Sequence, residues 1–554
     1  MPFGGTVGTQ FLGGSKAAAG TVCGTPIGAT VGAGGGTCAG ETFGTCLANF
    51  QDAFQASYAA GGPNAAFVPT ALANNALMTT GLLDPNYKSP RAIQMNVGMQ
   101  RELRPGLVLT ADYIRNVGLH YLIGTDINHT GDVAFFNKDA AATAIANTLA
   151  FCGAATIQAA AAANGCNVPK APGLAKDGGA TIATFGSFGL DSPYDEGLGA
   201  CQPNIGEPCA FGGINPNVGG LYQYHSGGRS VYNGMDIKLV QNVNHPFTGV
   251  KYMNFQFAYS LSRFVNSGSN FCTPTCVAGG DQDFANNALD NRNPNSLSGP
   301  GSLDRTHQFN LGGYADLPLG FRIGILSHFW SPFALTPFTL PVAPLPANNV
   351  GAAGGIFQTD FIGSGQIGNP LPIAETSASC GTMGGTCDYR LLKVGAFMRQ
   401  VGPVGLTRDI NNYNATIAGL PTPAGQTLIN SGLVTLADLQ ALGAVAQPIG
   451  VPPANNVGLG WLKDFDTTFS WVGHAWHERL TIIPSVSIFN TFNFANFDSA
   501  ASILTPQLNG GAGSINGTGP NTVANPRPDR IGAGTGVFAF GAPRTIEWGL
   551  KLQF

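Results

Sequence analysis

The last eleven residues of the chain, Arg544 to Phe554, alternate without interruption between apolar and polar side chains. The apolar set is Ile546, Trp548, Leu550, Leu552 and Phe554, and the polar set is Thr545, Glu547, Gly549, Lys551 and Gln553. A period of two is that of a β-strand, and about ten residues is the length at which a tilted strand crosses a bilayer. The segment therefore predicts a strand with one apolar face, which fits either a membrane barrel or the edge of a soluble sandwich.

Eight further segments alternate in the same way and are separated by connections of two kinds. The segments lie at 92–101, 107–116, 235–239, 253–261, 307–312, 321–325, 465–471 and 480–488. The short connections are 102–106, 244–251, 317–320 and 475–479, and the long ones are 117–229, 265–305, 332–460 and 491–543. Short and long connections alternate strictly. Outer-membrane barrels have this pattern, with short periplasmic turns and long extracellular loops, whereas a soluble sandwich has no reason to sort its connections by side.

Composition agrees with a membrane barrel. Asp, Glu, Lys and Arg make up only 10% of the chain, against about 25% in ordinary soluble domains. No apolar run approaches the roughly 20 residues of a membrane-spanning helix. The net charge is -4, and no basic block indicates a nucleic-acid partner. We therefore expect an all-β protein, an antiparallel transmembrane β-barrel of the bacterial outer membrane.

The chain divides into two parts. Residues 1–91 are rich in Gly and Ala and lack a sustained period, so we expect an irregular extracellular loop region with at most a short helix near 45–60. Residues 92–554 are expected to form a partial barrel. Within its loops, the Ala-rich segment 140–163 and the segment 435–443, which begins with Thr435, are candidate helices, and a further hairpin is expected inside 332–460. Pro484 predicts a bulge in its strand.

The number of strands is odd. Nine strands joined in this way begin and end in the same direction, whereas bacterial single-chain barrels are almost always even-numbered. The sequence thus reads as the C-terminal part of a larger barrel. We expect a sheet that stays incompletely closed, or an extra strand from 1–91 or from a hairpin in 332–460.

Ten of the eleven cysteines form close couples in stretches rich in Gly, Asn and Pro. The candidate disulfides are Cys38/Cys46, Cys152/Cys166, Cys201/Cys209, Cys272/Cys276 and Cys380/Cys387, with Cys23 left over. Local couples without neighbouring histidines are typical of stapled loops in an oxidising compartment, although free thiols in disordered loops are the alternative. Residues 1–22 lack the basic and apolar regions of an export signal.

Seven short sequence motifs carry a family resemblance. They are Asp84-Pro85-Asn86-Tyr87, Gln94-Met95-Asn96-Val97-Gly98-Met99-Gln100-Arg101-Glu102-Leu103, Tyr232-Asn233-Gly234-Met235, Ala258-Tyr259-Ser260-Leu261-Ser262, Leu303-Asp304-Arg305-Thr306-His307-Gln308-Phe309, Phe489-Asn490-Thr491-Phe492-Asn493 and Trp548-Gly549-Leu550-Lys551-Leu552. In this order, over 84–554, the chain resembles the TonB-dependent receptor-like proteins of the Oar type found in acidobacteria. The terminal aromatic Phe554 also resembles the C-terminal assembly signal of outer-membrane barrels.

The resemblance implies a barrel of about twenty-two strands, preceded by a plug, a TonB-contacting segment and often a carboxypeptidase-regulatory-like β-sandwich. The sequence contains none of these three parts, so no energy-coupling residue can be carried over to it. The partners that follow are outer-membrane lipid, the barrel-assembly machinery through the terminal strand, and TonB only through a missing N-terminal part.

The sequence contains no convincing catalytic or metal-binding motif. His474, His477 and Glu478 lie close together, but their order is wrong for a zinc protease and they fall in a turn. A loop with Asp281, Asp283, Asp290 and Asp304 offers oxygen ligands for Ca²⁺, yet Ala285 stands where a calcium loop needs a ligand. We expect no catalytic residues, no metal, no cofactor and no enzyme.

The leading hypothesis is the barrel portion of an outer-membrane receptor or transporter with a polar lumen. Its lumen-facing residues are expected to be Asn96, Gln100, Asp112, Asp236, Lys238, Asn254, Gln256, Gln308, Asn310, Glu547 and Lys551. The alternative is a surface scaffold or adhesin whose disulfide-stapled loops bind a partner while the barrel serves as an anchor. A gene fragment without a function of its own is the third possibility.

Overall fold

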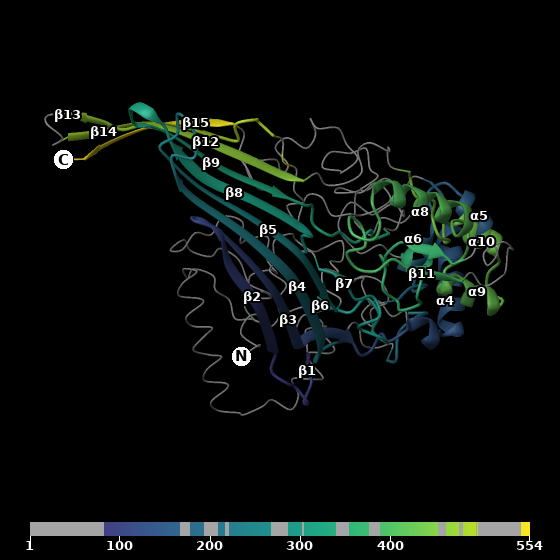
Figure 1. Cartoon of the computed structure of the whole chain (residues 1–554). Coiled ribbons are helices and arrows are strands. Elements are labelled where there is room, and N and C mark those ends of the chain that lie inside the picture. The colour runs from purple at the N-terminus through teal and green to yellow at the C-terminus, as the bar shows by residue number, and fades with distance from the viewer. Residues whose placement is uncertain are drawn as a thin grey trace, which may run out of the picture.

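The computed structural model describes residues 82–166, 178–192, 209–215, 221–267, 286–301, 304–339, 354–375, 388–451, 461–475, 480–494, 496 and 544–553. In this part of the chain, a sheet of long strands carries a body of helices beyond one of its ends (Figure 1). The calcium candidates Asp281 and Asp283 and the short helix expected near 45–60 lie outside the described residues.

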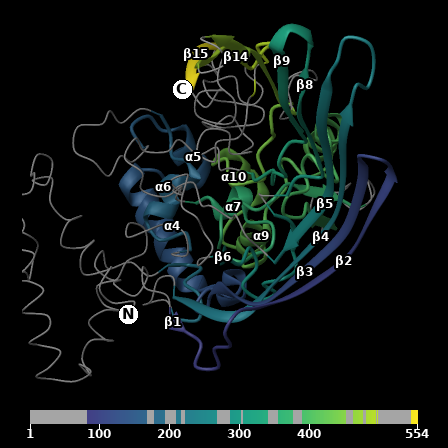
Figure 2. The same ribbon diagram turned by 60° about the vertical axis from the view of Figure 1, so that its left-hand side comes forward.

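Nine long strands form a curved antiparallel sheet in which each strand pairs with its neighbours in sequence (Figure 2). They are β2 (Arg91–Arg104), β3 (Leu107–Asp126), β4 (Tyr222–Asn244), β5 (Tyr252–Asn266), β8 (His307–Asp316), β9 (Phe321–Trp330), β12 (Leu462–Trp471), β14 (Leu480–Phe489) and β15 (Thr545–Gln553). Short strands complete the sheet, namely β1 (Leu82–Leu83) on β4, β6 (Asn286–Asn287) on β3, β7 (Gly299–Pro300) on β5 and β13 (Gly473–Ala475) on β14. The period-two segments thus predicted the nine strands correctly.

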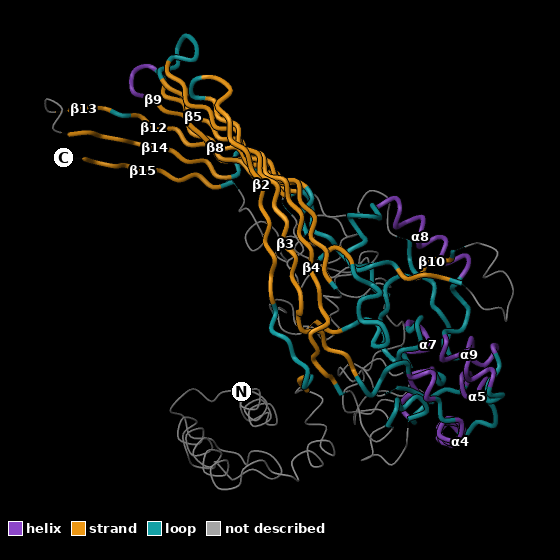
Figure 3. The backbone as a smooth tube through the Cα atoms, turned by 60° about the horizontal axis from the view of Figure 1, so that its bottom comes forward, coloured by secondary structure: helices purple, strands orange, loops and turns teal. Residues whose placement is uncertain are grey.

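The connections are sorted by side. Because neighbouring strands are antiparallel, all short turns lie at one end of the sheet, here called the inner end, and all long connections lie at the other, the outer end (Figure 3). β3 and β4 have 20 and 23 residues, so the connection between them is 127–221 rather than the expected 117–229. A bilayer needs only about ten strand residues, and the outer parts of β3 and β4 therefore project beyond it.

The turn between β2 and β3 depends on one glycine. Gly106 has φ +76°, and a Cβ atom there would lie 2.0 Å from the backbone oxygen of Asn242. Only glycine combines this backbone conformation with so close an approach of the neighbouring strand. The tight turn predicted after Arg104 is therefore fixed by Gly106 rather than by Pro105.

The bulge expected at Pro484 is not present. Pro484 pairs with Leu550 in an unbroken register between β14 and β15. On the other side, β14 pairs with β12 up to Ser485 and with β13 from Ile482, and the two stretches keep the same register. Proline lacks an N–H donor, so it interrupts the ladder on one side without adding a residue.

The connections at the outer end fold into a body that we call the cap. The β3–β4 connection contributes the 3₁₀ turn η3 (Asp132–Phe135) and the helices α4 (Lys138–Cys152), α5 (Ile157–Ala162) and α6 (Ile182–Ser187). The β9–β12 connection contributes α7 (Ile356–Thr359), α8 (Pro403–Thr416), α9 (Pro423–Asn430), α10 (Leu436–Ala441) and the antiparallel pair β10 (Pro372–Ala374) and β11 (Tyr389–Leu391). Among the described helices, none is long and apolar enough to cross a membrane.

Local signals explain where the cap helices begin and end. The side chain of Asn137 accepts hydrogen bonds from two backbone N–H groups at the start of α4, and Gly153 ends that helix in the left-handed conformation. The Ala-rich segment therefore forms two helices rather than one. Thr435 and Asp438 form a reciprocal capping box at the start of α10. The predicted helix after Thr435 and the hairpin within 332–460 are both confirmed.

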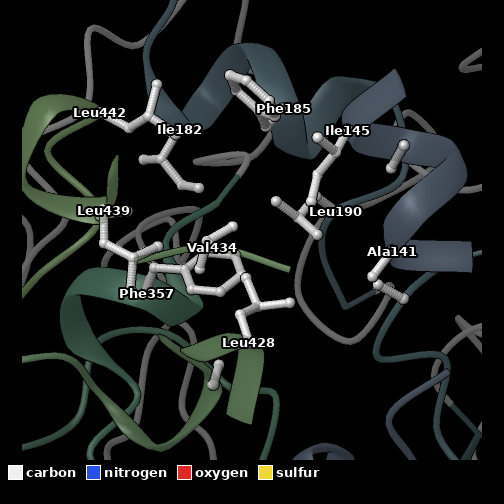
Figure 4. Close-up of a cluster of buried hydrophobic side chains, with 14 of the residues drawn as sticks. Ala141, Ile145, Ile182, Phe185, Leu190, Phe357, Leu428, Val434, Leu439 and Leu442 are labelled. Carbon is white, nitrogen blue, oxygen red and sulfur yellow. The ribbon is translucent and has the colours of Figure 1, made fainter. Parts of the chain in front are cut away.

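Two hydrophobic cores hold the cap together. The first joins the two longest described connections, because Ile145, Phe185 and Leu190 of the β3–β4 connection pack with Phe357 and Leu428 of the β9–β12 connection (Figure 4). The second lies within the β9–β12 connection, around β10, β11 and α8. The described parts of the β3–β4 and β9–β12 connections thus form a folded body with its own interior.

The sheet does not close. Among the described strands, β2 pairs only with β3 and β15 pairs only with β14, and every residue of both edge strands is exposed. This agrees with the expectation of an incompletely closed sheet, and no described residue supplies an extra strand between the two edges.

Candidate functional site: a polar sheet face and a loop cap

Strand register places the polar side chains on one face of the sheet. One row runs from Asp112 on β3 to Asp236 on β4, and continues through Ser260 on β5 to Gln308 on β8. The residues expected to line a lumen all share this face, namely Asn96, Gln100, Asp112, Asp236, Lys238, Asn254, Gln256, Gln308, Asn310, Glu547 and Lys551. A continuous polar wall therefore crosses all nine strands.

The opposite face is apolar and exposed. Met95 on β2, Phe257 on β5 and Phe469 on β12 belong to it, and each exposes more than a third of its surface. A face of this kind is stable in lipid rather than in water, since exposed apolar patches of such extent are rare on soluble monomers.

Aromatic rings gather near the outer end of the apolar face. The ring of Tyr259 stacks on that of Phe309 with centroids 4.5 Å apart, and His307 stacks on Trp461 at 6.0 Å. At the inner end, the indole N–H of Trp471 donates to the backbone oxygen of Leu319. Aromatic girdles at two levels are typical of the two interfaces of a membrane barrel.

The terminal strand completes the apolar face at one edge. Ile546, Trp548, Leu550 and Leu552 pair with Ile488, Val486, Pro484 and Ile482 of β14. Trp548 is 78% exposed. Phe554, the last residue of the expected assembly signal, lies outside the described residues.

Of the histidine group in the inner turn, the structure describes only His474. Nδ1 of His474 lies 3.3 Å from the hydroxyl of Thr481 on the exposed hairpin, and His477 and Glu478 lie outside the described residues. No cluster of three or more His, Cys, Asp or Glu residues arranged for a metal occurs among the residues described.

The two calcium candidates that the structure describes have other partners. Asp290 pairs with Arg292. Asp304 pairs with Arg399, which comes from the β9–β12 connection and also donates to the backbone oxygen of Pro332. The Asp304 side chain is 1% exposed and that of Arg399 is 10% exposed. This buried ion pair attaches the cap to the outer rim of the sheet.

The cysteine couples are described only in part. A disulfide joins Cys152 at the end of α4 to Cys166 after α5, with Cα atoms 5.0 Å apart. Cys209 is also disulfide-bonded. The remaining candidates lie outside the described residues: Cys38, Cys46, Cys201, Cys272, Cys276, Cys380 and Cys387, together with Cys23.

The cap also buries a group of polar residues that we call the acidic hub: Asp126, His129, Asp132, Asp191, Ser192 and Asp360. Nδ1 of His129 lies 2.8 Å from Oδ2 of Asp132, and the hydroxyl of Ser192 donates to the same oxygen. Backbone N–H groups of Ile362, Ser364 and Gly365 donate to Asp360. Sequence inspection missed this hub, because its members come from segments up to 234 residues apart in numbering.

Burial changes the acidity of the hub. It raises the pKa of Asp132, while the hydrogen bond from His129 acts in the opposite direction. Burial also raises the pKa of Asp360 to about 7, and the nearby Asp132 adds to the rise. The sequence signal that comes nearest to revealing the site is the spacing of Asp126, His129 and Asp132 directly after a strand.

Residues 24–339 match the family model described as an outer membrane beta barrel domain. No curated protein matches the chain. Among solved structures, the chain is similar to the outer membrane transporter YddB from Escherichia coli, with 8% identity, a TM-score of 0.31 and coverage of 74% of this chain. The match covers 30% of the length of YddB.

The family match extends over more than half of the 554 residues and includes β2, β3, β4, β5, β8 and β9. The chain therefore belongs to the outer membrane beta barrel domain family and is a protein of the bacterial outer membrane.

Proposed function

We propose that this chain is the barrel portion of an outer-membrane receptor or transporter of the TonB-dependent, Oar-like type. The seven sequence motifs, which occur over 84–554 in the order of the family, support the assignment to this type. The observation that carries a receptor function is the combination of a polar wall across nine strands with a folded cap at its outer end. The polar wall offers a path through the membrane, and the cap offers a surface on the outside that binds a ligand.

The proposed partners follow from the same geometry. The apolar face contacts outer-membrane lipid. The exposed, alternating strand β15 is the element through which the barrel-assembly machinery recognises the chain. TonB acts only through a plug and contact segment N-terminal to the barrel, so energy coupling requires that part. The protein has no catalytic role and no nucleic-acid partner in this proposal.

A surface scaffold or adhesin is the second candidate, and one observation favours it. The cap has two hydrophobic cores of its own, a disulfide and a buried ion pair to the rim. A body of this kind is rigid enough to bind a partner by itself, with the sheet serving only as an anchor.

Crosslinking in living cells separates the two functions. One strain expresses residues 1–554, and a second expresses the longest in-frame product of the same gene. A receptor predicts that TonB crosslinks to the longer product and not to residues 1–554 alone. Absence of TonB crosslinking in both strains, together with adhesion of both to a surface or a cell, contradicts the receptor and supports the scaffold.

A further inference from the structure

The acidic hub lies where three connections of the cap meet. Asn291, from the β5–β8 connection, accepts from the backbone N–H of Asp126 and donates to the backbone oxygen of His129. Asp191, from the β3–β4 connection, accepts from the backbone N–H of Gly354 in the β9–β12 connection. These hydrogen bonds join the end of β3 and the β3–β4 connection to the two other connections, so the hub holds the base of the cap together.

We propose that the acidic hub is a proton-operated latch, which holds the three connections of the cap together in acid and loosens them as the solution becomes neutral. The proposal goes beyond the receptor function and does not depend on it.

Among the described residues, the buried carboxyl groups of the hub have too little positive charge around them. Asp126, Asp132 and Asp360 are almost fully inaccessible to solvent. Oδ2 of Asp126 and Oδ1 of Asp132 accept no hydrogen bond. An ionised carboxylate buried without a cationic partner costs much more free energy than the neutral protonated form.

The charged and titratable neighbours do not supply the missing charge. Among the described residues, those around the hub are Asp126, His129, Asp191, Asp290, Arg292, Asp360 and Tyr389. His129 faces both Asp126 and Asp132 and so balances at most one of them. The half-exposed side chain of Arg292 pairs with Asp290 and donates to the backbone oxygen of Ile362.

The sign of the pH effect follows from burial. The pKa of Asp360 is about 7 in the closed cap, and that of an exposed Asp is about 3.9. The closed cap therefore binds more protons than the open one, and its stability falls as pH rises from about 4 towards 7. The raised pKa of Asp132 adds to the same trend.

Hydrogen exchange of the full chain in detergent micelles tests the latch. After correction for intrinsic exchange, the opening equilibrium constant of the amides at 127–135 and 354–366 should increase about tenfold per pH unit between pH 5 and 6.5. It should level off near pH 7. The amides of β4 and β5 on the inner half of the sheet serve as the internal reference and should show no such increase. Opening that is independent of pH at the hub overturns the proposal.

An Asn variant separates protonation from other causes. Asp360→Asn keeps an oxygen for the backbone N–H groups of Ile362 and Ser364 and carries no charge, so it imitates the protonated form of the acid from which the expected slope arises. We expect the opening equilibrium constant of this variant to rise several-fold less over the same pH range than that of the wild type. Asp139→Asn, on the exposed first turn of α4, is the matched control and should keep the wild-type pH dependence.

Two results contradict the latch. The first is a wild-type pH dependence in Asp360→Asn. The second is recovery of protection at pH 7.5 on addition of Ca²⁺ alone, because the carboxylates would then hold a cation rather than protons. If Asp360→Asn does not fold, the pH dependence of exchange at the wild-type hub, relative to that of its own sheet, still decides.

Discussion

Phe257 and Gln256 are neighbours on β5 that face opposite media. Phe257 lies on the apolar face with Phe309, and Gln256 lies on the polar face opposite Val240 and Gly312. Phe257→Arg should destabilise the inserted protein by about 2–4 kcal/mol near the bilayer midplane, whereas Gln256→Arg should cost little because it adds a charge to a polar wall. Urea unfolding of the two variants in lipid vesicles measures the difference. Equal sensitivity at the two positions would indicate a soluble core with two apolar sides.

At single residues, the sequence predicts which face of the sheet a side chain occupies but not the partners of buried polar groups. The face of each strand residue followed from a period of two, since a strand turns successive side chains to opposite sides. Asp304 was considered as a calcium ligand because its partner Arg399 is 95 residues away in sequence. The hub residues were missed for the same reason. Buried polar partners are set by how loops meet in space, and no local pattern encodes them.

At the scale of elements, the cap is expected to respond as one body. Leu428 of α9 is fully buried in the core that also contains Ile145 and Phe185. Leu428→Ala should therefore cost about 2–5 kcal/mol through the cavity that it leaves, and should expose amides of α4 and α6 as well as those of α9. Val404→Ala on α8 is the control, because Val404 is 80% exposed.

Hydrogen exchange resolves the response of each element. The strands of the sheet should keep their protection in Leu428→Ala, since the core of the cap lies beyond their ends. Loss of protection confined to α9 would show that the two connections fold independently. An equal loss of protection in β5 would show that cap and sheet unfold together.

Sheet and cap differ in how well the sequence predicts them. Strands and tight turns follow from periodicity, and two cap elements, α10 and the β10–β11 pair, were predicted from a capping box and from the length of the connection. The Ala-rich segment also predicted a helix where α4 and α5 lie. The remainder of the cap was not predicted, because its helices are short and its core joins residues of two connections that are at least 145 residues apart in numbering.

At the scale of the whole molecule, the directions of the strands determine what can complete the sheet. β2 runs from the outer to the inner end, and so does β15, because seven antiparallel strands lie between them. Direct closure would place the two edges parallel. A second copy inserted in the same orientation brings an identical, inward-running edge and meets the same obstacle. Only an odd number of additional strands gives antiparallel pairing at both edges.

Open edges are not tolerated in lipid. Each unsatisfied backbone group in the hydrocarbon region costs several kcal/mol, and β2 alone has 14 residues. The nine strands should therefore fail to form a stable closed barrel by themselves, whatever the length of the protein in the cell.

The parity of the strand number is directly testable. One variant carries a copy of β14 (Leu480–Phe489) in place of residues 1–83, which adds an outward-running strand ahead of β2 and leaves the terminal strand intact. Its matched control carries a copy of the two-stranded segment Leu462–Phe489 at the same place.

In lipid vesicles, the variant with one added strand should become resistant to protease and show heat-modifiable migration on gels, with a cysteine in the added strand crosslinking to β15. The control with two added strands, and the chain without additions, should do neither. Closure of the nine-stranded chain by a β2–β15 crosslink, or equal closure of both variants, would show that strand direction does not limit how this sheet is completed.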